Sequence, residues 1–187
     1  MVNFEERTIK ETSIYKGNIT EYVVKTVELP DGRRATREIV LHDDASAVIA
    51  FIDGKLLCVE QFRKPLERTS IEIPAGLIDQ GETPLEAAQR ELEEETAYQA
   101  KNWSEVTSFY NTPGFCNEKL TIFEVSELVA VDNPLAQDED ENLRVMTLTL
   151  EEAWGLMESG RICDSKTVFA LFYWKMKQLE TKGTHHG

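Results

Sequence analysis

The chain has 187 residues, of which 41% are hydrophobic, and it carries a formal net charge of −14. This length predicts one domain, or one domain with a small appendage, and the apolar fraction is sufficient for a packed core. Nucleic acids and anionic membranes bind proteins through basic patches, so we expect neither as a partner of a chain this acidic. No apolar run in the sequence is long enough to span a membrane.

Cysteine and histidine usage narrows the chemistry further. The three cysteines are few and widely spaced: Cys58, Cys116 and Cys163. An odd number at wide spacing predicts reduced thiols in a cytoplasmic protein, not a disulfide framework or a zinc site. The N-terminus, MVNFEERTIK, lacks the apolar segment of a signal peptide. A histidine-based triad is not expected either, because the only histidines are His42, His185 and His186.

The first 44 residues predict three strands of a small antiparallel sheet. Residues 8–15 and 18–29 are rich in alternating β-branched residues, Asp31–Gly32 is a strong hairpin turn, and residues 35–41 return as the third strand. A sheet this thin does not bury a core alone. We therefore expect residues 1–44 to form a separate unit that packs on the rest of the chain or on a second subunit.

Residues 45–187 predict strands interleaved with helices. Further strands are expected at residues 45–52, 56–62, 70–73, 102–110, 120–128 and 143–150. A helix is expected from Pro84, a second at residues 151–159, and a third that begins after the capping residue Asp164. This order predicts an α/β (α+β) fold in which a mixed β-sheet lies between helices.

The helix from Pro84 lies in the most informative stretch, residues 76–98, GLIDQGETPLEAAQRELEEETAY. Thr83 is the predicted N-cap, Pro84 suits the first helical position, and Glu86 closes a capping box. A period of 3.6 residues places three side chains on one apolar stripe: Leu85, Ala88 and Leu92.

Glutamates crowd the same helix. Glu91 and Glu95 lie one turn apart beside the apolar stripe, and Glu94 lies further round the same side. Like charges at this spacing repel one another. A solvated acidic face is the ordinary interpretation of such a helix. A divalent-cation site is the alternative, because Mg²⁺ prefers carboxylate oxygens, and the preceding loop from Pro74 to Gly81 has a backbone that can approach an ion closely.

The spacing of these residues resembles the Nudix box of Nudix hydrolases. The matching pattern is Gly76, five residues, Glu82, seven residues, Arg90-Glu91-Leu92, one residue, Glu94-Glu95. Ala97 departs from it, since the family has glycine there. An alanine in a left-handed conformation costs about 1–2 kcal/mol; the alternative is that the helix ends differently. The segments EQFRKPLER, EIPAG, the turn with Pro113, and DEDENLRV resemble the ADP-ribose pyrophosphatases within this family.

The resemblance implies Mg²⁺-dependent hydrolysis of ADP-ribose to AMP and ribose 5-phosphate, with Mn²⁺ as an alternative metal. It places the metal on the backbone carbonyl of Ala75 and on three carboxylates: Glu91, Glu95 and Glu94. It gives Gly76, Glu82 and Arg90 a structural role in the box, with Glu82 paired to Arg90. Other nucleoside diphosphate sugars or dinucleotides remain alternative substrates. A non-catalytic ADP-ribose sensor is a third alternative.

The same resemblance supplies the remaining site residues. Glu139 and Glu141 occupy the positions of catalytic-loop glutamates, and we favour Glu139 as the general base that activates water. Arg37 and Arg63 match positions that contact the adenine or the phosphates, and Glu118 matches a residue near the terminal ribose. The family also implies a homodimer that exchanges its N-terminal sheets, with each site built from both subunits.

Overall fold

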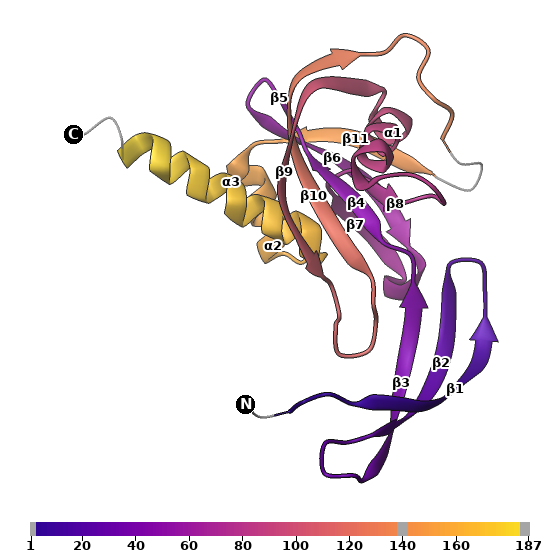
Figure 1. Ribbon diagram of the computed structural model, residues 1–187. Coiled ribbons are helices and arrows are strands. Elements are labelled where there is room, and N and C mark those ends of the chain that lie inside the picture. Colours follow the sequence, from indigo (N-terminus) through magenta and orange to yellow (C-terminus); the bar gives the residue numbers. More distant parts are fainter. Residues whose placement is uncertain (1–2, 138–141, 184–187) are drawn as a thin grey trace. The chain divides into compact units, whose positions relative to one another are not determined.

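The computed structural model describes residues 3–137 and 142–183. For residues 182 and 183 it describes the backbone but not the side chains. The chain divides into two compact units. Figure 1 shows the chain coloured by its position in the sequence. The first unit lies within Met1–Ala45 and Ser108–Leu120, and the second within Ser46–Thr107 and Thr121–Gly187. Each unit is described by itself.

The first unit contains a three-stranded antiparallel sheet in the order β1-β2-β3. Its strands are β1 (Arg7–Lys16), β2 (Thr20–Glu28) and β3 (Arg34–His42). Gly32 takes φ +83° in the turn between β2 and β3, a conformation that favours glycine. β2 buries Val23 and Val27, whereas β1 is exposed at all ten positions. The three predicted strands are therefore present, and one of them leaves both faces open.

Residues 108–120 complete the first unit. Asn117 accepts a hydrogen bond from the His42 backbone N–H (2.8 Å) and donates one to the His42 carbonyl oxygen (3.1 Å). The backbone N–H of Val40 donates to the carbonyl of Phe115 at 2.8 Å. The predicted turn around Pro113 is thus part of a longer segment that is fastened to β3, 75 residues away in sequence.

Eight further strands form two sheets. One sheet has the order β8-β4-β10-β9, and the other has the order β11-β6-β5, with β7 also paired to β6. The strands are β4 (Ala45–Ile49), β5 (Phe51–Ile52), β6 (Lys55–Arg63), β7 (Arg68–Glu72), β8 (Ala75–Leu77), β9 (Tyr98–Tyr110), β10 (Lys119–Ala130) and β11 (Leu143–Leu148). A short 3₁₀ turn, η1 (Lys64–Leu66), joins β6 to β7.

Helices cover both sides of the strands in the second unit, with α1 on one side and α2 and α3 on the other (Figure 1). They are α1 (Pro84–Thr96), α2 (Leu150–Glu158) and α3 (Ser165–Gly183). The alternation along β10 shows the two layers, because Phe123 and Val125 pack with Leu92 of α1 while Glu124 accepts a hydrogen bond from Tyr173 of α3. The predicted fold, mixed β-sheet between helices, is confirmed.

The predicted start of α1 is confirmed, but the prediction of its apolar stripe is partly wrong. Thr83 and Glu86 form the predicted capping box, with the Thr83 N–H donating to Glu86 Oε2 at 2.8 Å. Leu85, however, is 37% exposed. The packed face instead contains Ala88, Leu92 and two glutamates, and Leu85 lies in the first turn at the margin of that face. The packed face is therefore more polar than the sequence pattern predicts.

All three cysteines are free thiols. Cys58 is buried in β6, Cys116 is half-buried, and Cys163 is exposed. Burial, with a smaller contribution from the negative charge of Asp164, raises the pKa of Cys58 to about 12. Among the described residues no helix is long and apolar enough to cross a membrane.

Candidate active site

Residues 72–76, between the end of β7 and the start of β8, tie several elements together. The backbone N–H of Ile73 donates to Thr167 Oγ1 of α3 at 2.9 Å. The carbonyl of Pro74 accepts a hydrogen bond from the N–H of Val48 in β4 at 2.8 Å. The N–H of Ala75 donates to Glu95 Oε2 of α1 at 3.1 Å. This segment therefore has a fixed position against both helices and the sheet.

Gly76 leaves room for the carboxylate of Glu91. A Cβ atom built on Gly76 would lie 1.9 Å from Glu91 Oε1 and 2.0 Å from its carboxyl carbon. Only glycine allows this approach without moving Glu91. Glu91 is 8% exposed and Glu95 is 1% exposed, so both carboxylates lie in the packed face of α1 and not on a solvated face.

Arg90 connects the acidic residues of this stretch. It makes a two-point ion pair with Glu82, at 2.9 Å from Nε to Oε1 and 3.0 Å from Nη2 to Oε2, so the pairing predicted for these two residues is present. Its Nη1 donates to Glu91 at 2.7 Å and to Glu94 at 2.9 Å. The hydrogen bonds between Arg90 and Glu82 are the largest cause of a pKa shift in both groups: they lower the pKa of Glu82 and raise the pKa of Arg90.

These side chains fit a hard divalent cation in chemistry and charge. The region is half-buried and has three net negative charges, because four carboxylates face one guanidinium: Glu82, Glu91, Glu94 and Glu95 with Arg90. Carboxylate oxygens are the donors that Mg²⁺ prefers, and the space beside Gly76 is shaped around one of them. In the part of the chain that the structure describes, no three acidic, histidine or cysteine side chains already converge as metal ligands. Arg90 holds Glu91 and Glu94, while Ala75 holds Glu95.

Arg63 belongs to the same region. Its guanidinium donates to Glu72 from Nε at 2.9 Å and from Nη2 at 2.7 Å. The hydrogen bonds with Glu72 raise the pKa of Arg63, and the charge of Glu95 adds to that effect. Glu72 was not predicted as a site residue, although a glutamate inside the buried run from Ser70 to Ile73 is a signal that could have revealed it.

Comparison with known proteins identifies the family. The NUDIX domain pattern matches residues 41–170, which is more than half of the chain. The chain belongs to the Nudix family. The stretch with Gly76, Arg90 and the α1 glutamates is thus its Nudix box, and it lies wholly within the matched residues.

Relatives extend the likeness over nearly the whole chain. An ADP-ribose pyrophosphatase from Bacillus subtilis is 46% identical over 95% of this chain and 97% of its own length. A methanol dehydrogenase activator from Bacillus methanolicus is 43% identical over 94% of this chain and 95% of its own. A solved structure described as an ADP compounds hydrolase superposes with a TM-score of 0.84 at 22% identity, over 98% of this chain and 99% of that one, which supports the fold.

Ala97, the departure from the Nudix box, ends α1 in the left-handed conformation at φ 59° and ψ 29°. Its N–H donates to the carbonyl of Glu93 at 2.8 Å, and its own carbonyl accepts from Val131 at 2.9 Å. Of the two alternatives that the sequence allows for Ala97, the structure has the strained alanine and not a different helix end. The contacts of Glu91, Glu94 and Glu95 with Arg90 and Ala75 are present on the same helix.

Two of the predicted substrate-binding residues lie in the first unit. Arg37 on β3 is paired with Glu6, at 2.8 Å from Nε to Oε2, and donates to the carbonyl of Thr36 at 2.9 Å. Glu118 accepts a hydrogen bond from Asn111 at 2.8 Å and lies 3.8 Å from the His42 ring. The predicted catalytic-loop glutamates, Glu139 and Glu141, lie outside the described residues.

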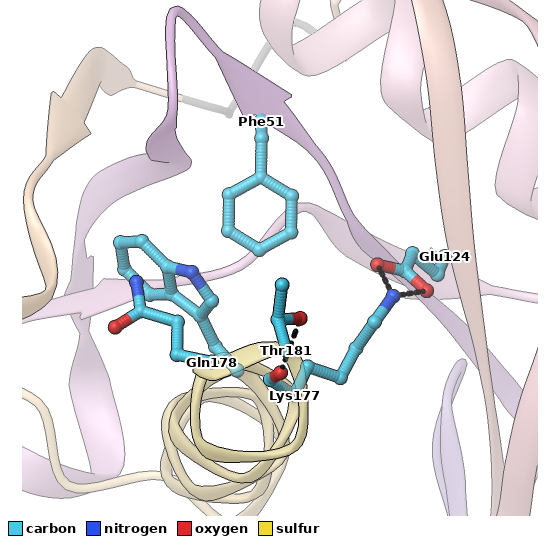
Figure 2. A pocket seen from close by; sticks show the side chains of 6 residues that line it. Phe51, Glu124, Lys177, Gln178 and Thr181 are labelled. Atoms are coloured by element: carbon cyan, nitrogen blue, oxygen red, sulfur yellow. Dashed lines mark hydrogen bonds and ion pairs between the residues drawn. The ribbon is translucent and has the colours of Figure 1, made fainter. Parts of the chain in front are cut away.

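A separate hollow of about 370 Å³ lies along one face of α3 (Figure 2). It is lined by Phe51, Glu124, Trp174, Lys177, Gln178 and Thr181. Figure 2 shows Lys177 reaching the carboxylate of Glu124, with contacts of 2.6 and 2.7 Å. None of the Nudix box residues lines it, and its two charged groups neutralise each other, so it is not the Nudix catalytic site.

Proposed function

We propose that this protein hydrolyses the pyrophosphate bond of ADP-ribose to AMP and ribose 5-phosphate, with Mg²⁺ or Mn²⁺ as cofactor. The observation that carries the proposal is the Nudix box geometry, in which Gly76 and Ala75 meet the buried carboxylates Glu91 and Glu95. The Bacillus subtilis relative named ADP-ribose pyrophosphatase, similar over nearly the full length of both chains, supports the substrate.

In the proposed reaction, the oxygen of a water molecule forms a bond to one phosphorus, and the bond from that phosphorus to the bridging oxygen breaks. A divalent cation at Glu91, Glu94, Glu95 and the Ala75 carbonyl would lower the pKa of a bound water and offset phosphate charge. Arg63 would bind the anionic diphosphate, because a guanidinium pairs with phosphate oxygens through parallel N–H donors. Arg37 and Glu118 would bind the nucleoside and the terminal ribose.

The water must lose a proton as it attacks, so the proposal needs a general base. Glu139 is the proposed base, with Glu141 as a further ligand, and the support for both is their sequence resemblance alone. Substitution Glu139→Gln is expected to lower kcat by orders of magnitude with nearly intact Mg²⁺ affinity. Wild-type turnover by this variant would remove Glu139 from the mechanism.

Two further parts of the proposal concern the setting of the enzyme. We propose a homodimer formed through the N-terminal sheet, supported by the exposure of all ten positions of β1, including Ile14 and Tyr15. A cytoplasmic location belongs to the same proposal, because the three free thiols suit a reducing compartment.

A substrate panel tests the activity. Purified protein is incubated with Mg²⁺ and ADP-ribose, NAD, NADH or a sugar nucleotide, and AMP release is measured by chromatography, with a chelator as the metal-free arm. NAD and NADH are included because dinucleotides are alternative substrates of the same class of reaction. We expect the highest kcat/KM for ADP-ribose. Tight binding of ADP-ribose without cleavage of any substrate would instead indicate a sensor.

A matched pair of variants tests the carboxylates. Glu95→Gln removes a charge that the proposal assigns to the cation, and it is expected to abolish most AMP release. Glu93→Gln is the control, since Glu93 lies on the same helix but contacts Gln99 (2.7 Å) and the N–H of Leu135 (3.1 Å). Equal activity of the two variants would contradict the assignment.

A further inference from the structure

Glu72 is a buried carboxylate held between two cations from distant parts of the chain. It is 2% exposed at the end of β7. Arg63 of β6 grips both of its oxygens, at 2.9 and 2.7 Å. Lys166, in the first turn of α3 and 94 residues away, donates to the second oxygen. Lys166 itself is largely buried and lies 3.0 Å from Asp164, the residue that precedes α3.

The charges around Glu72 outweigh its burial. Burial alone would raise the pKa of this carboxyl group, but the hydrogen bonds and charges of Arg63 and Lys166 bring the pKa down to about 2. Glu72 is therefore ionised at neutral pH and remains an acceptor for both cations. An ionised buried carboxylate that lost one partner would be costly, so both partners constrain it.

This arrangement fixes the orientation of Arg63. A guanidinium has five N–H donors in a planar fork, and the bonds to Glu72 use Nε and Nη2. The side chain of Arg63 is still 39% exposed, whereas that of Glu72 is 3% exposed. The inner edge of the guanidinium is thus held by the protein, and Nη1 lies away from the bonds that Glu72 makes.

The held arginine belongs to the same locus as the Nudix carboxylates. Glu72 and Ala75 are three residues apart on one segment, and Ala75 donates to Glu95. The negative charge of Glu95 acts on Arg63. The segment that anchors Glu95 therefore also carries the carboxylate that orients Arg63.

We propose that Glu72 and Lys166 are positioning residues for substrate binding: Glu72 orients the guanidinium of Arg63, and Lys166 offsets the charge of Glu72 so that Arg63 keeps its attraction for a diphosphate. This inference rests on the proposed hydrolysis of an anionic pyrophosphate substrate. It assigns a role in the site to two residues that lie outside the Nudix box, one of them 94 residues further along the chain.

A double-substitution cycle tests whether Glu72 acts through Arg63. Arg63→Lys and Glu72→Gln are made singly and together, and kcat and KM for ADP-ribose are measured with Mg²⁺. Each single change is expected to raise KM by about 10-fold or more, with kcat changed by less than about 3-fold, since loss of a charge-assisted hydrogen bond removes binding. The double variant is expected to be no worse than the worse single variant, because coupled residues are not additive. Additive effects on KM would overturn the inference.

A second pair separates positioning from folding. Lys166→Met alone leaves Glu72 buried with one cation, so both the thermal midpoint and the substrate affinity are expected to fall. Glu72→Gln/Lys166→Met removes both charges and is expected to recover most of the thermal midpoint but not the KM. Recovery of both together would show a merely structural role.

Glu60 supplies a matched control. It is also a carboxylate in the paired strands β6 and β7, and it is held by two cations, Arg144 (2.5 Å) and Arg161. Glu60→Gln is expected to lower the thermal midpoint, because the Glu60 side chain is only 14% exposed and would leave two arginines without their carboxylate partner. KM is expected to stay within about 2-fold of wild type, because neither arginine is assigned to substrate binding. An increase in KM equal to that of Glu72→Gln would contradict the specificity of the inference.

Calorimetric titration with ADP-ribose keeps the two proposals distinguishable. If wild-type protein releases no AMP, the proposed function fails, and the same cycle is then scored on the dissociation constants. In that case the positioning role is supported if each single variant has a higher dissociation constant for ADP-ribose and the two effects are not additive in the double variant. An unchanged dissociation constant in folded Glu72→Gln overturns it.

Discussion

At the scale of single residues, Gly76 determines where the carboxylate of Glu91 lies. A methyl group at this position would occupy the space of that carboxylate, which is the far end of a flexible side chain and can move aside. The expected effect is therefore larger on function than on folding. This separation makes Gly76 a useful probe of the box.

Substitution Gly76→Ala is expected to lower the free energy of unfolding by about 1 kcal/mol, as small overpacking does. AMP release should fall at least about 10-fold and require more Mg²⁺ if Glu91 is the metal ligand proposed above, because moving a ligand weakens a metal site. Urea denaturation and activity as a function of Mg²⁺ concentration measure the two effects. Gly155→Ala is the control, since a Cβ there meets nothing within 4 Å. An unchanged Mg²⁺ requirement in Gly76→Ala would contradict the role of Glu91.

Ala97 is strained at the other end of the same helix. Its φ of 59° is a conformation that costs an alanine about 1–2 kcal/mol. Ala97→Gly is expected to raise the free energy of unfolding by about 1 kcal/mol, part of the relief being offset by the greater freedom of glycine in the unfolded chain. Urea denaturation measures the change. Ala87→Gly, inside α1, should have the opposite sign, and a loss of stability in Ala97→Gly would show that the strain is relieved elsewhere.

At the scale of elements, local signals predicted local structure. The N-cap at Thr83, the capping box with Glu86 and the ends of the first three strands depend on residues within a few positions of one another, and they were predictable. The pairing of Glu72 with Lys166 was not predictable from the sequence. Lys166 lies 94 residues further along the chain, and only the packing of α3 against β7 brings it close. Leu85 was placed wrongly because helical period alone does not show which part of a helix its neighbours cover.

The link between β7 and α3 also predicts how stability depends on pH. The pKa of Glu72 is lowered from 4.5 to about 2 in the folded protein. A carboxyl group with a depressed folded pKa contributes stability above its unfolded pKa, and that contribution is lost as the pH falls through the folded pKa. Between pH 5 and pH 2 the wild type should therefore lose roughly 3 kcal/mol more than Glu72→Gln/Lys166→Met, given about 1.4 kcal/mol per pKa unit.

Urea denaturation at several pH values from 6 to 2 measures this difference. Most other carboxyl groups keep their partners in both proteins, so the difference between the two curves reports on Glu72 together with Asp164, which also loses Lys166 in the double variant. Parallel curves would mean that Arg63 and Lys166 do not hold the charged form of Glu72.

At the scale of the whole molecule, the exposed first strand bears on assembly. β1 has no buried position, and its apolar residues Ile9, Ile14 and Tyr15 are 41%, 58% and 65% exposed. Several large apolar side chains on a strand without a buried position favour an interaction surface. The proposed occupant is a second copy of this chain.

Sedimentation equilibrium tests this assembly, with an expected mass of twice the 21.3 kDa of the chain. Ile14→Glu is expected to give a folded monomer with low activity, because a charge in an apolar interface costs several kcal/mol unless it is paired. Leu179→Glu, at a 62% exposed position of α3, is the control and should keep the mass of the wild type. Full activity from a stable monomer would contradict a site built from two subunits.

The three thiols differ in exposure, so the rates at which they are alkylated report on local opening of the chain. Cys163 is exposed, Cys116 is half-buried, and Cys58 is buried with a pKa near 12, so a soluble alkylating reagent should label them in that order. Cys116 belongs to the first unit, while Cys58 belongs to the second. Mass spectrometry at successive times would therefore give a local opening rate for each unit without any substitution in the protein. Labelling of Cys58 would report the opening of the core of the second unit.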